Sequence, residues 1–551
     1  GILYHVRTWV GDSDYAQVSY DYDPYGNVDT QVQYSAYGTA STSPAVGSAQ
    51  TTTTTYDSTY HTYPLSVEDP LGHTTTTTYD YDLGVPTSVT DPNGAVTSAT
   101  YDTFGRMESV TAPGDQSATL QITYNDTLVP YQIDLVQRVD ASSSIRISRF
   151  YDGLGQLIQV QTIGAQINGS ATNVVSDYQY DLHGQARASV PYTYTGDVAY
   201  QTGGFDSHAF TNTVYDPLGR VISTTAPNHN MITYSYDDLQ ASVIDPMGTI
   251  TTTDYDVWGR VIKVDEYQLD EQSEKIELGP DLTYTYDVLG QLLSVTKGSA
   301  TTTTIAYDNA GRKTEMDDPD MGEWSYTYDG AGNLETQTDA RGCVTSLEYD
   351  ALNRLVQKTY SATGQCLSNL VPLPSTIAYS YDSILNNNEG IGRRTGMSDG
   401  SGSTAWVYDE RGRLLQESKT IDTQTFTTSY TYNSADQPVS MTYPDGEIIY
   451  YTYASDGQFV SMQRTATPTY VYVKDVTYDE AGRITEIELG QDGDDAILDR
   501  TYSYYDWDDS NGGLLESLET VNISESILQN LTYSYDANGN RLSMTDANGH
   551  T

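Results

Sequence analysis

Three short stretches of this sequence carry residues whose types and spacing could do chemistry. "GMSDG" (396–400) matches G-x-S-x-G, which presents a nucleophilic serine when it lies on a sharp turn between a strand and a helix. "QDGDDAILD" (491–499) and "DWDDSNGG" (506–513) offer the carboxylates that Ca²⁺ prefers. No helical pattern follows the serine, so we expect a strand and a turn there and no catalytic residue.

The acidic stretches also fail as calcium loops of the EF-hand type. A loop that starts at Asp506 requires Gly at its sixth position and Glu at its twelfth, where this chain has Asn511 and Ser517. Weak association of cations is one interpretation of these stretches, and solvated acidic turns are the other.

No other pattern indicates a cofactor or a metal. The seven histidines show no ligand spacing, and the sequence contains neither H-E-x-x-H nor paired C-x-x-C. A phosphate-binding G-x-x-x-x-G-K-[ST] loop is also missing. We therefore expect no catalytic, cofactor-binding or metal-binding residues and no enzymatic activity.

The strongest pattern is a repeat, Y-D-x-x-G-[RQN]. It occurs twelve times, and its most regular copies lie 21 residues apart. The full copies begin at Tyr22, Tyr101, Tyr151, Tyr180, Tyr215, Tyr255, Tyr286, Tyr307, Tyr328, Tyr408, Tyr478 and Tyr535, and "YDALNR" (349–354) is a degenerate copy. A second signal, of the D-P-x-G type, alternates with the first, as at 69–72, 91–94 and 245–248.

Both signals read D-x-x-G, and one physical account covers them. An Asp at the first position of a type I turn accepts hydrogen bonds from later backbone N–H groups, and Gly at the fourth takes the left-handed conformation of a bulge. The Arg after the Gly is expected to meet a turn Asp or to stack on a Tyr ring. We assign this structural role to Tyr307, Asp308, Gly311, Arg312, Tyr328, Asp329, Gly332, Tyr349, Asp350 and Arg354.

The turns predict a chain of β-hairpins. One copy divides into a turn at 329–332, a strand at 333–338, a turn at 339–342 and a strand at 343–349. Segments such as "WSYTYD" (324–329) place aromatic residues on one face of a strand and hydroxyl residues on the other, because side chains alternate. We expect the Tyr rings to form ladders across the strands.

Composition limits the partners. The net charge of −49 disfavours binding to the phosphate backbone of nucleic acid. No stretch of 18 consecutive apolar residues occurs, so we expect no membrane insertion. Cys343 and Cys366 are the only cysteines, and their pairing is open.

We expect a single continuous repeat array over residues 1–551 that is a segment of a larger protein. Longer intervals between repeats indicate irregular or insertion-bearing parts near 30–60, 120–148, 192–213, 265–281, 358–375, 383–391 and 487–500.

The Y-D-x-x-G-[RQN] motif with its alternating D-P-x-G turn resembles the YD repeat of the RHS family. That family includes bacterial Rhs and wall-associated polymorphic toxins, the BC components of insecticidal Tc toxins, and the teneurin adhesion receptors. The resemblance implies an all-β fold in which tandem hairpins form a long antiparallel ribbon that spirals into a hollow shell or barrel. In the toxins the shell holds an effector, and in teneurins it is an extracellular scaffold.

This chain departs from the family in one respect. The closing signature D-P-x-G-x-x-x-G-G-x-N-x-Y is missing, and with it the aspartate pair that performs self-cleavage in the family. We therefore expect a noncatalytic, secreted or surface-located array, which is the wall of a shell that encloses or presents an effector. The alternative is an extracellular scaffold or adhesion module. The expected partners are other segments of the same protein or an enclosed effector, with glycans or cell-surface molecules for the scaffold.

Overall fold

The computed structural model describes residues 3–127, 129–167, 169–182, 184–196, 198–202, 208–270, 272, 274–299, 301–361, 376–464, 470–490 and 496–550. These residues form 46 β-strands and one three-residue 3-10 helix, Val46–Ser48, which lies in the irregular part near 30–60. The predicted all-β fold is confirmed.

The chain divides into two compact units, each made of two segments that are distant in sequence. The first unit comprises Gly1–Gln116 and Leu282–Ser429, and the second comprises Ser117–Asp281 and Tyr430–Thr551. Each unit thus joins an earlier and a later stretch of the repeat array.

The strands of the first unit are β1 (His5–Trp9), β2 (Asp14–Tyr22), β3 (Val28–Tyr34), β4 (Gly38–Thr39), β5 (Ala49–Tyr56), β6 (Pro64–Glu68), β7 (Thr74–Asp80), β8 (Val85–Thr90), β9 (Val96–Tyr101), β10 (Met107–Thr111), β25 (Leu282–Tyr286), β26 (Leu292–Lys297), β27 (Thr301–Tyr307), β28 (Lys313–Asp318), β29 (Gly322–Tyr328), β30 (Leu334–Thr338), β31 (Val344–Tyr349), β32 (Leu355–Ser361), β33 (Thr376–Tyr381), β34 (Arg394–Asp399), β35 (Gly402–Tyr408) and β36 (Leu414–Ile421). Strand β37 (Gln424–Tyr432) runs across the boundary into the second unit.

The strands of the second unit are β11 (Leu120–Asn125), β12 (Tyr131–Arg138), β13 (Ser144–Tyr151), β14 (Leu157–Ile167), β15 (Ser170–Tyr180), β16 (Gln185–Ser189), β17 (Tyr192–Tyr194), β18 (Phe210–Tyr215), β19 (Val221–Thr225), β20 (Met231–Asp237), β21 (Gln240–Ile244), β22 (Ile250–Tyr255), β23 (Val261–Leu269), β24 (Lys275–Glu277), β38 (Pro438–Thr442), β39 (Ile448–Tyr453), β40 (Phe459–Arg464), β41 (Tyr470–Tyr478), β42 (Ile484–Leu489), β43 (Leu498–Tyr504), β44 (Leu515–Asn522), β45 (Ile527–Tyr535) and β46 (Arg541–Asp546).

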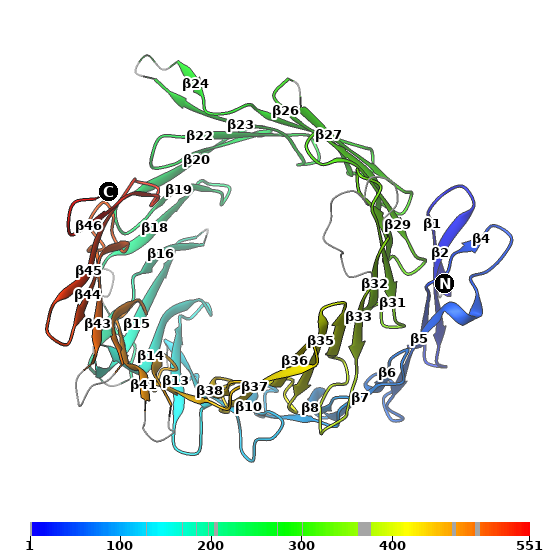
Figure 1. The fold of residues 1–551 in the computed structure, drawn as a ribbon, viewed down its shortest axis with the longest axis horizontal. Coiled ribbons are helices and arrows are strands. Elements are labelled where there is room, and N and C mark those ends of the chain that lie inside the picture. The colour runs from blue at the N-terminus through cyan, green and yellow to red at the C-terminus, as the bar shows by residue number, and fades with distance from the viewer. Residues whose placement is uncertain are drawn as a thin grey trace. The chain divides into compact units, whose positions relative to one another are not determined.

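Strands pair antiparallel with their neighbours in the chain, hairpin after hairpin (Figure 1). In β29 and β30, Ser325 lies opposite Thr338 and Thr327 opposite Thr336, and the register then shifts by one residue at Tyr328. The same shift occurs at Tyr307 and Tyr349. It is the bulge that the D-x-x-G turn predicts, because a left-handed Gly adds one residue to one side of the hairpin.

The two faces of a strand differ as the sequence predicts. In β29, Trp324, Tyr326 and Tyr328 are half-buried, whereas the alternating residues are exposed. On the exposed face, Thr327 Oγ1 and Thr336 Oγ1 form a cross-strand hydrogen bond of 2.6 Å. The same pairing recurs nine residues apart in Thr100–Ser109, Thr285–Ser294, Thr431–Ser440, Thr452–Ser461 and Ser534–Ser543.

Most described side chains are half-buried or exposed, and the core is therefore small. In the second unit it lies on β13–β15, where Phe150 and Val175 are almost fully buried. In the first unit the side chain of Tyr15 on β2 is buried. A repeat array of this kind depends on cross-strand hydrogen bonds and turn chemistry more than on one central core.

The insertion-bearing parts adopt several forms. Residues 265–281 lengthen β23 and pair it with β24. The stretch 383–391 is a loop held by Asn388, which donates to Trp406 O at 2.9 Å and accepts from Tyr408 N at 2.8 Å. Residues 203–207, 362–375 and 491–495 of the other insertions lie outside the described residues, as does Cys366, whereas Cys343 is disulfide-bonded.

The described part of the chain contains no helix long and apolar enough to cross a bilayer.

Candidate functional site

The Tyr-Asp turns are the sites that the sequence singles out, and Asp308 shows how such a turn is built. Its Oδ1 accepts hydrogen bonds from the backbone N–H groups of Ala310 and Arg312, each at 2.9 Å. Its own N–H donates to Arg312 O at 2.9 Å, and Gly311 N donates back to Asp308 O at 3.0 Å. The carboxylate thus replaces the backbone partners that a tight turn leaves unpaired.

The same geometry holds at the other predicted turns. Asp329 Oδ1 accepts from Asn333 N at 2.8 Å, and Asp350 Oδ1 accepts from Leu352 N and Arg354 N at 2.9 and 3.0 Å. The D-P-x-G type of turn uses it as well, as at Asp245 with Met247 N and Thr249 N. The same Asp-capped turn therefore occurs in both types of turn, at either end of the strands.

The fourth turn position requires a left-handed backbone. The φ angles of Gly311 and Gly332 are +82° and +92°. In "YDALNR" the same position is Asn353, with φ of +59°. Asn is the side-chain-bearing residue that tolerates this conformation best, which explains how the degenerate copy keeps its turn.

The Arg after the turn Gly contacts two groups at once. Arg312 Nε donates to Asp308 Oδ2 at 2.7 Å, and its guanidinium carbon lies 4.8 Å from the ring centroid of Tyr328 in the next hairpin. Arg220 and Arg483 repeat this arrangement with Asp216 and Tyr236, and with Asp479 and Tyr504. Each guanidinium therefore joins one turn to the aromatic residue of the following hairpin.

The motif Tyr makes a contact that sequence reasoning missed. Tyr328 Oη donates to Lys313 O at 2.8 Å, and Tyr349 Oη donates to Leu334 O at 3.0 Å. In each case the acceptor is the residue just after the preceding turn motif. The bond recurs in Tyr56, Tyr79, Tyr101, Tyr180, Tyr236, Tyr381, Tyr408, Tyr453, Tyr478, Tyr504 and Tyr535.

The excess of Tyr (50) over Phe (6) was the signal that could have revealed this bond, because only Tyr carries the hydroxyl. The expected ladder of stacked rings is not what holds Tyr328, since no ring of the described residues stacks on it. A cation and a carbonyl oxygen hold it instead.

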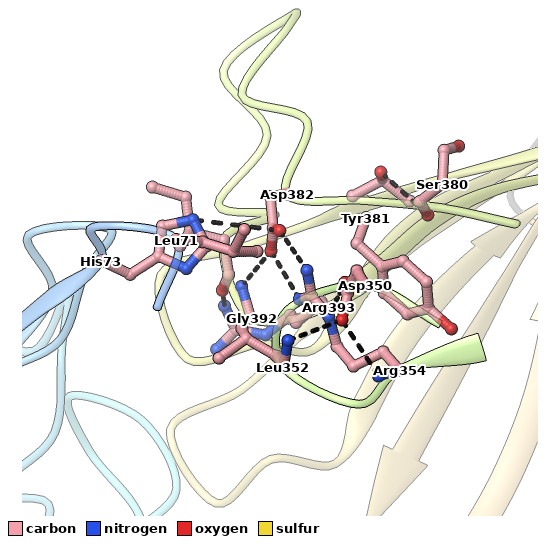
Figure 2. A network of polar contacts seen from close by, with 12 residues as sticks. Leu71, His73, Asp350, Leu352, Arg354, Ser380, Tyr381, Asp382, Gly392 and Arg393 are labelled. Atoms are coloured by element: carbon pink, nitrogen blue, oxygen red, sulfur yellow. Dashed lines mark hydrogen bonds and ion pairs between the residues drawn. The ribbon is translucent and has the colours of Figure 1, made fainter. Parts of the chain in front are cut away.

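A larger polar network surrounds Arg354 in the first unit (Figure 2). Its guanidinium contacts Asp350 Oδ2 at 2.7 Å in its own turn and both carboxylate oxygens of Asp382, at 2.9 and 2.5 Å. Gly392 N donates to Asp382 Oδ1 at 2.7 Å, and His73 Nε2 lies 3.9 Å from Asp382 Oδ2.

The charges in this network determine the ionisation of Asp382. Burial alone would raise the pKa of Asp382, but the hydrogen bonds from Arg354 and Gly392 outweigh it and lower the pKa below its ordinary value. The bond to Asp382, followed by the one to Asp350, raises the pKa of Arg354. Arg354 thus holds the carboxylates of two turns together, Asp350 of its own and Asp382 of the next.

Within each unit, turns of the later segment contact the earlier segment at a nearly constant separation. In the first unit, Gln33 donates to Ala331 O, Asn93 to Ile391 O and Arg411 to Pro113 O, each over 298 residues. In the second unit, Ser455 donates to Gly164 O over 291 residues and Asn538 to Asp245 Oδ2 over 293. We call each of these lines of contact a seam.

The seam of the first unit includes a buried ion pair. Arg411 Nη2 lies 2.5 Å from Asp115 Oδ2, and both side chains are 8% exposed. Arg411 belongs to a Tyr-Asp turn and Asp115 to the turn that follows β10.

Two of the three stretches that could do chemistry have ordinary structures, and residues 491–495 of the third lie outside the described residues. Ser398 lies inside β34 opposite Ala378, and a turn to another strand follows it, so the strand–turn–helix geometry of a nucleophile elbow is not formed. Asp506 and Asp509 accept backbone N–H bonds in a turn. Among the described residues, no group of three His, Cys, Asp or Glu side chains could hold a metal ion.

Comparison with known proteins agrees with this geometry. The RHS Repeat model matches residues 81–117, 328–365 and 408–448, and the Teneurin YD-shell model matches residues 178–320. The chain thus contains repeats that are similar to those of the RHS and teneurin YD-repeat models. The two models match different parts of the YD-repeat chain, and the matched residues lie in both of its units.

Solved structures with the same fold come from Tc toxins. TcdB2-TccC3 is 18% identical with a TM-score of 0.79. The match covers 97% of the YD-repeat chain and 30% of the TcdB2-TccC3 chain. TcdB2-TccC3 without its hypervariable C-terminal region is 17% identical with a TM-score of 0.80, covering 99% and 33%. The Tc holotoxin pore of Photorhabdus luminescens is 16% identical with a TM-score of 0.79, covering 99% and 32%.

The YD-repeat chain therefore spans about a third of the length of the solved chains it matches. A search of the curated proteins found no match.

Proposed function

We propose that the YD-repeat chain is a noncatalytic wall segment of an RHS-type shell that encloses or presents an effector. The observation that carries this proposal is the fold likeness to the Tc toxin chains over 97–99% of the YD-repeat chain. The enclosed partner is an effector segment of the same large protein, and the protein acts outside the cell, as a secreted or surface protein.

The turn chemistry supports a structural role. Asp308 accepts two backbone bonds and pairs with Arg312, so its carboxylate has no oxygen left to accept a proton from a substrate. The arginines are likewise engaged with their own turns rather than gathered as an anion site. The residues that recur most in the chain are thus occupied in building it.

A second candidate is an extracellular scaffold or adhesion module. The match of residues 178–320 to the Teneurin YD-shell model favours it. Exposed aromatic rings at turn tips, such as Trp258 and Phe104, could stack on sugars, and this makes glycans the expected ligand under that hypothesis.

One experiment separates the two candidates. The gene is sequenced beyond codon 551, and the complete reading frame is expressed and treated with trypsin. The shell proposal expects a closing D-P-x-G-x-x-x-G-G-x-N-x-Y signature and a following domain that resists trypsin in the native protein but is degraded when expressed alone. Further repeats that end in a wall anchor, together with binding of the native protein to glycans or cells, would decide for the scaffold.

A further inference from the structure

The hydroxyl-bearing face of the ribbon is covered on strands β14 and β15 of the second unit. In other repeats, as in β29, this face carries side chains that are exposed to water. On β14 and β15, however, Gln159 and Gln161 are 0% exposed and Asp177 is 4% exposed. Residues 198–202, from the insertion at 192–213, lie over them and accept their hydrogen bonds. We call residues 198–202 the strap.

The side chains under the strap bind its main chain. Gln159 Nε2 donates to Gln201 O at 3.0 Å, and Gln159 Oε1 accepts from Gln201 N at 3.0 Å. Gln161 Nε2 donates to Ala199 O at 2.7 Å. The two amides thus contact alternate residues of the strap, which is the spacing at which an extended chain presents its main-chain groups on one side.

The amides are held in place by the strands that carry them. Asp177 Oδ1 accepts from Gln159 Nε2 at 2.5 Å, and Asp177 Oδ2 accepts from Tyr192 Oη of β17 at 2.7 Å. Gln161 Nε2 in turn donates to Gln159 Oε1 at 2.7 Å. Because these bonds do not involve the strap, the amides form a site that is already oriented for a ligand.

One polar atom of this site lacks a donor. Gln161 Oε1 is buried and has no hydrogen-bond partner among the described residues. Gln159 binds both the carbonyl and the N–H of Gln201, whereas Gln161 binds only the carbonyl of Ala199. A buried acceptor without a donor destabilises a protein. The site can therefore accept one more N–H group than the strap gives it.

The side chains of the strap contribute little to its contact with the sheet. Val198 and Tyr200 are 36% and 37% exposed, and the Tyr200 ring centroid lies 6.1 Å from that of Phe150. The hydrogen bonds from the sheet go to main-chain groups, which every residue except Pro offers in the same form. Other extended polypeptides therefore carry the groups that this site binds.

We propose that Gln159, Gln161 and Asp177 form a binding site for the main chain of an extended polypeptide, and that the strap is its displaceable resident. The incoming polypeptide bonds both amides at alternate residues and supplies the N–H that Gln161 Oε1 lacks. Recognition depends little on side chains and excludes Pro at the residue that Gln159 binds. The site lies within one unit, so its exchange goes beyond the proposed function and does not require a closed shell.

A labelled peptide of residues 196–202 (GDVAYQT) tests the site by fluorescence anisotropy. In the chain, Gln201→Pro removes the N–H that Gln159 accepts and so opens the strap, whereas Gln201→Ala keeps that N–H and is the matched control. We expect the peptide to bind the Gln201→Pro chain. It should bind the unmodified and Gln201→Ala chains roughly tenfold more weakly, because a site that is mostly occupied has a lower apparent affinity. The same peptide carrying Gln201→Pro should not bind.

Three outcomes would overturn the proposal. The peptide could fail to bind the Gln201→Pro chain, it could bind the opened and unmodified chains equally well, or its binding could survive Gln159→Met with Gln161→Met in the opened chain. Circular dichroism and thermal melting check that each variant is folded. Tyr200→Ala, which removes the ring contact with Phe150, replaces Gln201→Pro if that variant is not folded.

Discussion

Tyr328 Oη donates a hydrogen bond to the carbonyl oxygen of Lys313, 15 residues earlier, at 2.8 Å. The acceptor belongs to the hairpin before the one in which the Tyr lies, so the bond fastens each repeat to its predecessor. The same hydrogen bond occurs in many repeats, so the Tyr hydroxyl is a regular link between neighbouring hairpins.

Removing this hydroxyl should weaken the junction between two hairpins. We expect Tyr328→Phe to lower the free energy of unfolding by about 1 kcal/mol, the net value of one hydrogen bond. Tyr326→Phe is the matched control, because Tyr326 lies on the same strand and its hydroxyl has no hydrogen-bond partner among the described residues. Hydrogen exchange at the amides of β28 and β29 measures the effect. Equal exchange in the two variants would contradict the proposed role of the hydroxyl.

The left-handed turn position predicts a graded response to substitution. Gly332 has φ of +92°, and a Cβ added there would meet no atom within 4 Å, so only backbone strain opposes a side chain. Gly332→Asn should be tolerated, as Asn353 shows at the equivalent position, whereas the β-branched Gly332→Val should destabilise the turn.

Asp329→Ala provides the comparison for that series. It removes the side-chain bonds to Asn333 and should cost about 1 kcal/mol, less than Gly332→Val. Urea denaturation compares the variants. If Gly332→Val were tolerated as well as Gly332→Asn, the turn would not depend on positive φ.

The buried ion pair of the first unit should couple its two segments. Removing one partner of a buried pair leaves a charge uncompensated, so we expect Arg411→Met to cost about 3–5 kcal/mol. The double variant with Asp115→Leu should lose less than the sum of the single changes, which a double-mutant cycle measures. Arg220→Met is the control, because its pair with Asp216 is half exposed and should contribute at most about 1 kcal/mol.

Acid should destabilise the turns. Backbone hydrogen bonds from Ser142 lower the pKa of Asp140 to about 2, and a backbone bond from Arg220 lowers the pKa of Asp216. A carboxylate whose pKa is lower in the folded state stabilises the fold above its unfolded pKa of about 3.9, and this contribution is lost as the pH falls through the folded pKa. We therefore expect urea midpoints to fall between pH about 4 and pH about 2. A midpoint that stays constant over this window would refute the prediction.

Two carboxyl groups, on β41 and β42, have pKa values that are raised instead of lowered. Burial, together with Glu488, raises the pKa of Asp475, and burial raises the pKa of Glu486. A carboxyl group with a raised pKa costs stability when it is ionised, so Asp475→Asn should raise the urea midpoint at pH 7 and lose this advantage as the pH falls. A lower midpoint at pH 7 would show that the Asp475 carboxylate is needed in its ionised form.

Local structure could be predicted from the sequence because its causes are local. The D-x-x-G turn joins residues at most four apart, as Asp308 and Arg312 do, and the two-residue period of a strand sorts Tyr328 from Thr327. The strands predicted at 333–338 and 343–349 accordingly agree with β30 and β31 to within one residue at each end. The pairing of each Arg with its own turn Asp follows from the same short spacing.

Tertiary structure alone decided which distant groups meet. That a Tyr hydroxyl bonds the residue after the preceding turn, 15 residues back for Tyr328 and 26 for Tyr381, was visible only when neighbouring hairpins lay side by side. The partners of Asn93 and Arg411 lie 298 residues away in the sequence. Which residues meet at this distance depends on the summed twist of many strands, and no local sequence pattern predicts it. The third position of such a turn is therefore polar and in contact with Gln166 at Asp456 but exposed at Trp258, since only the accumulated path of the ribbon determines which edge has a neighbour.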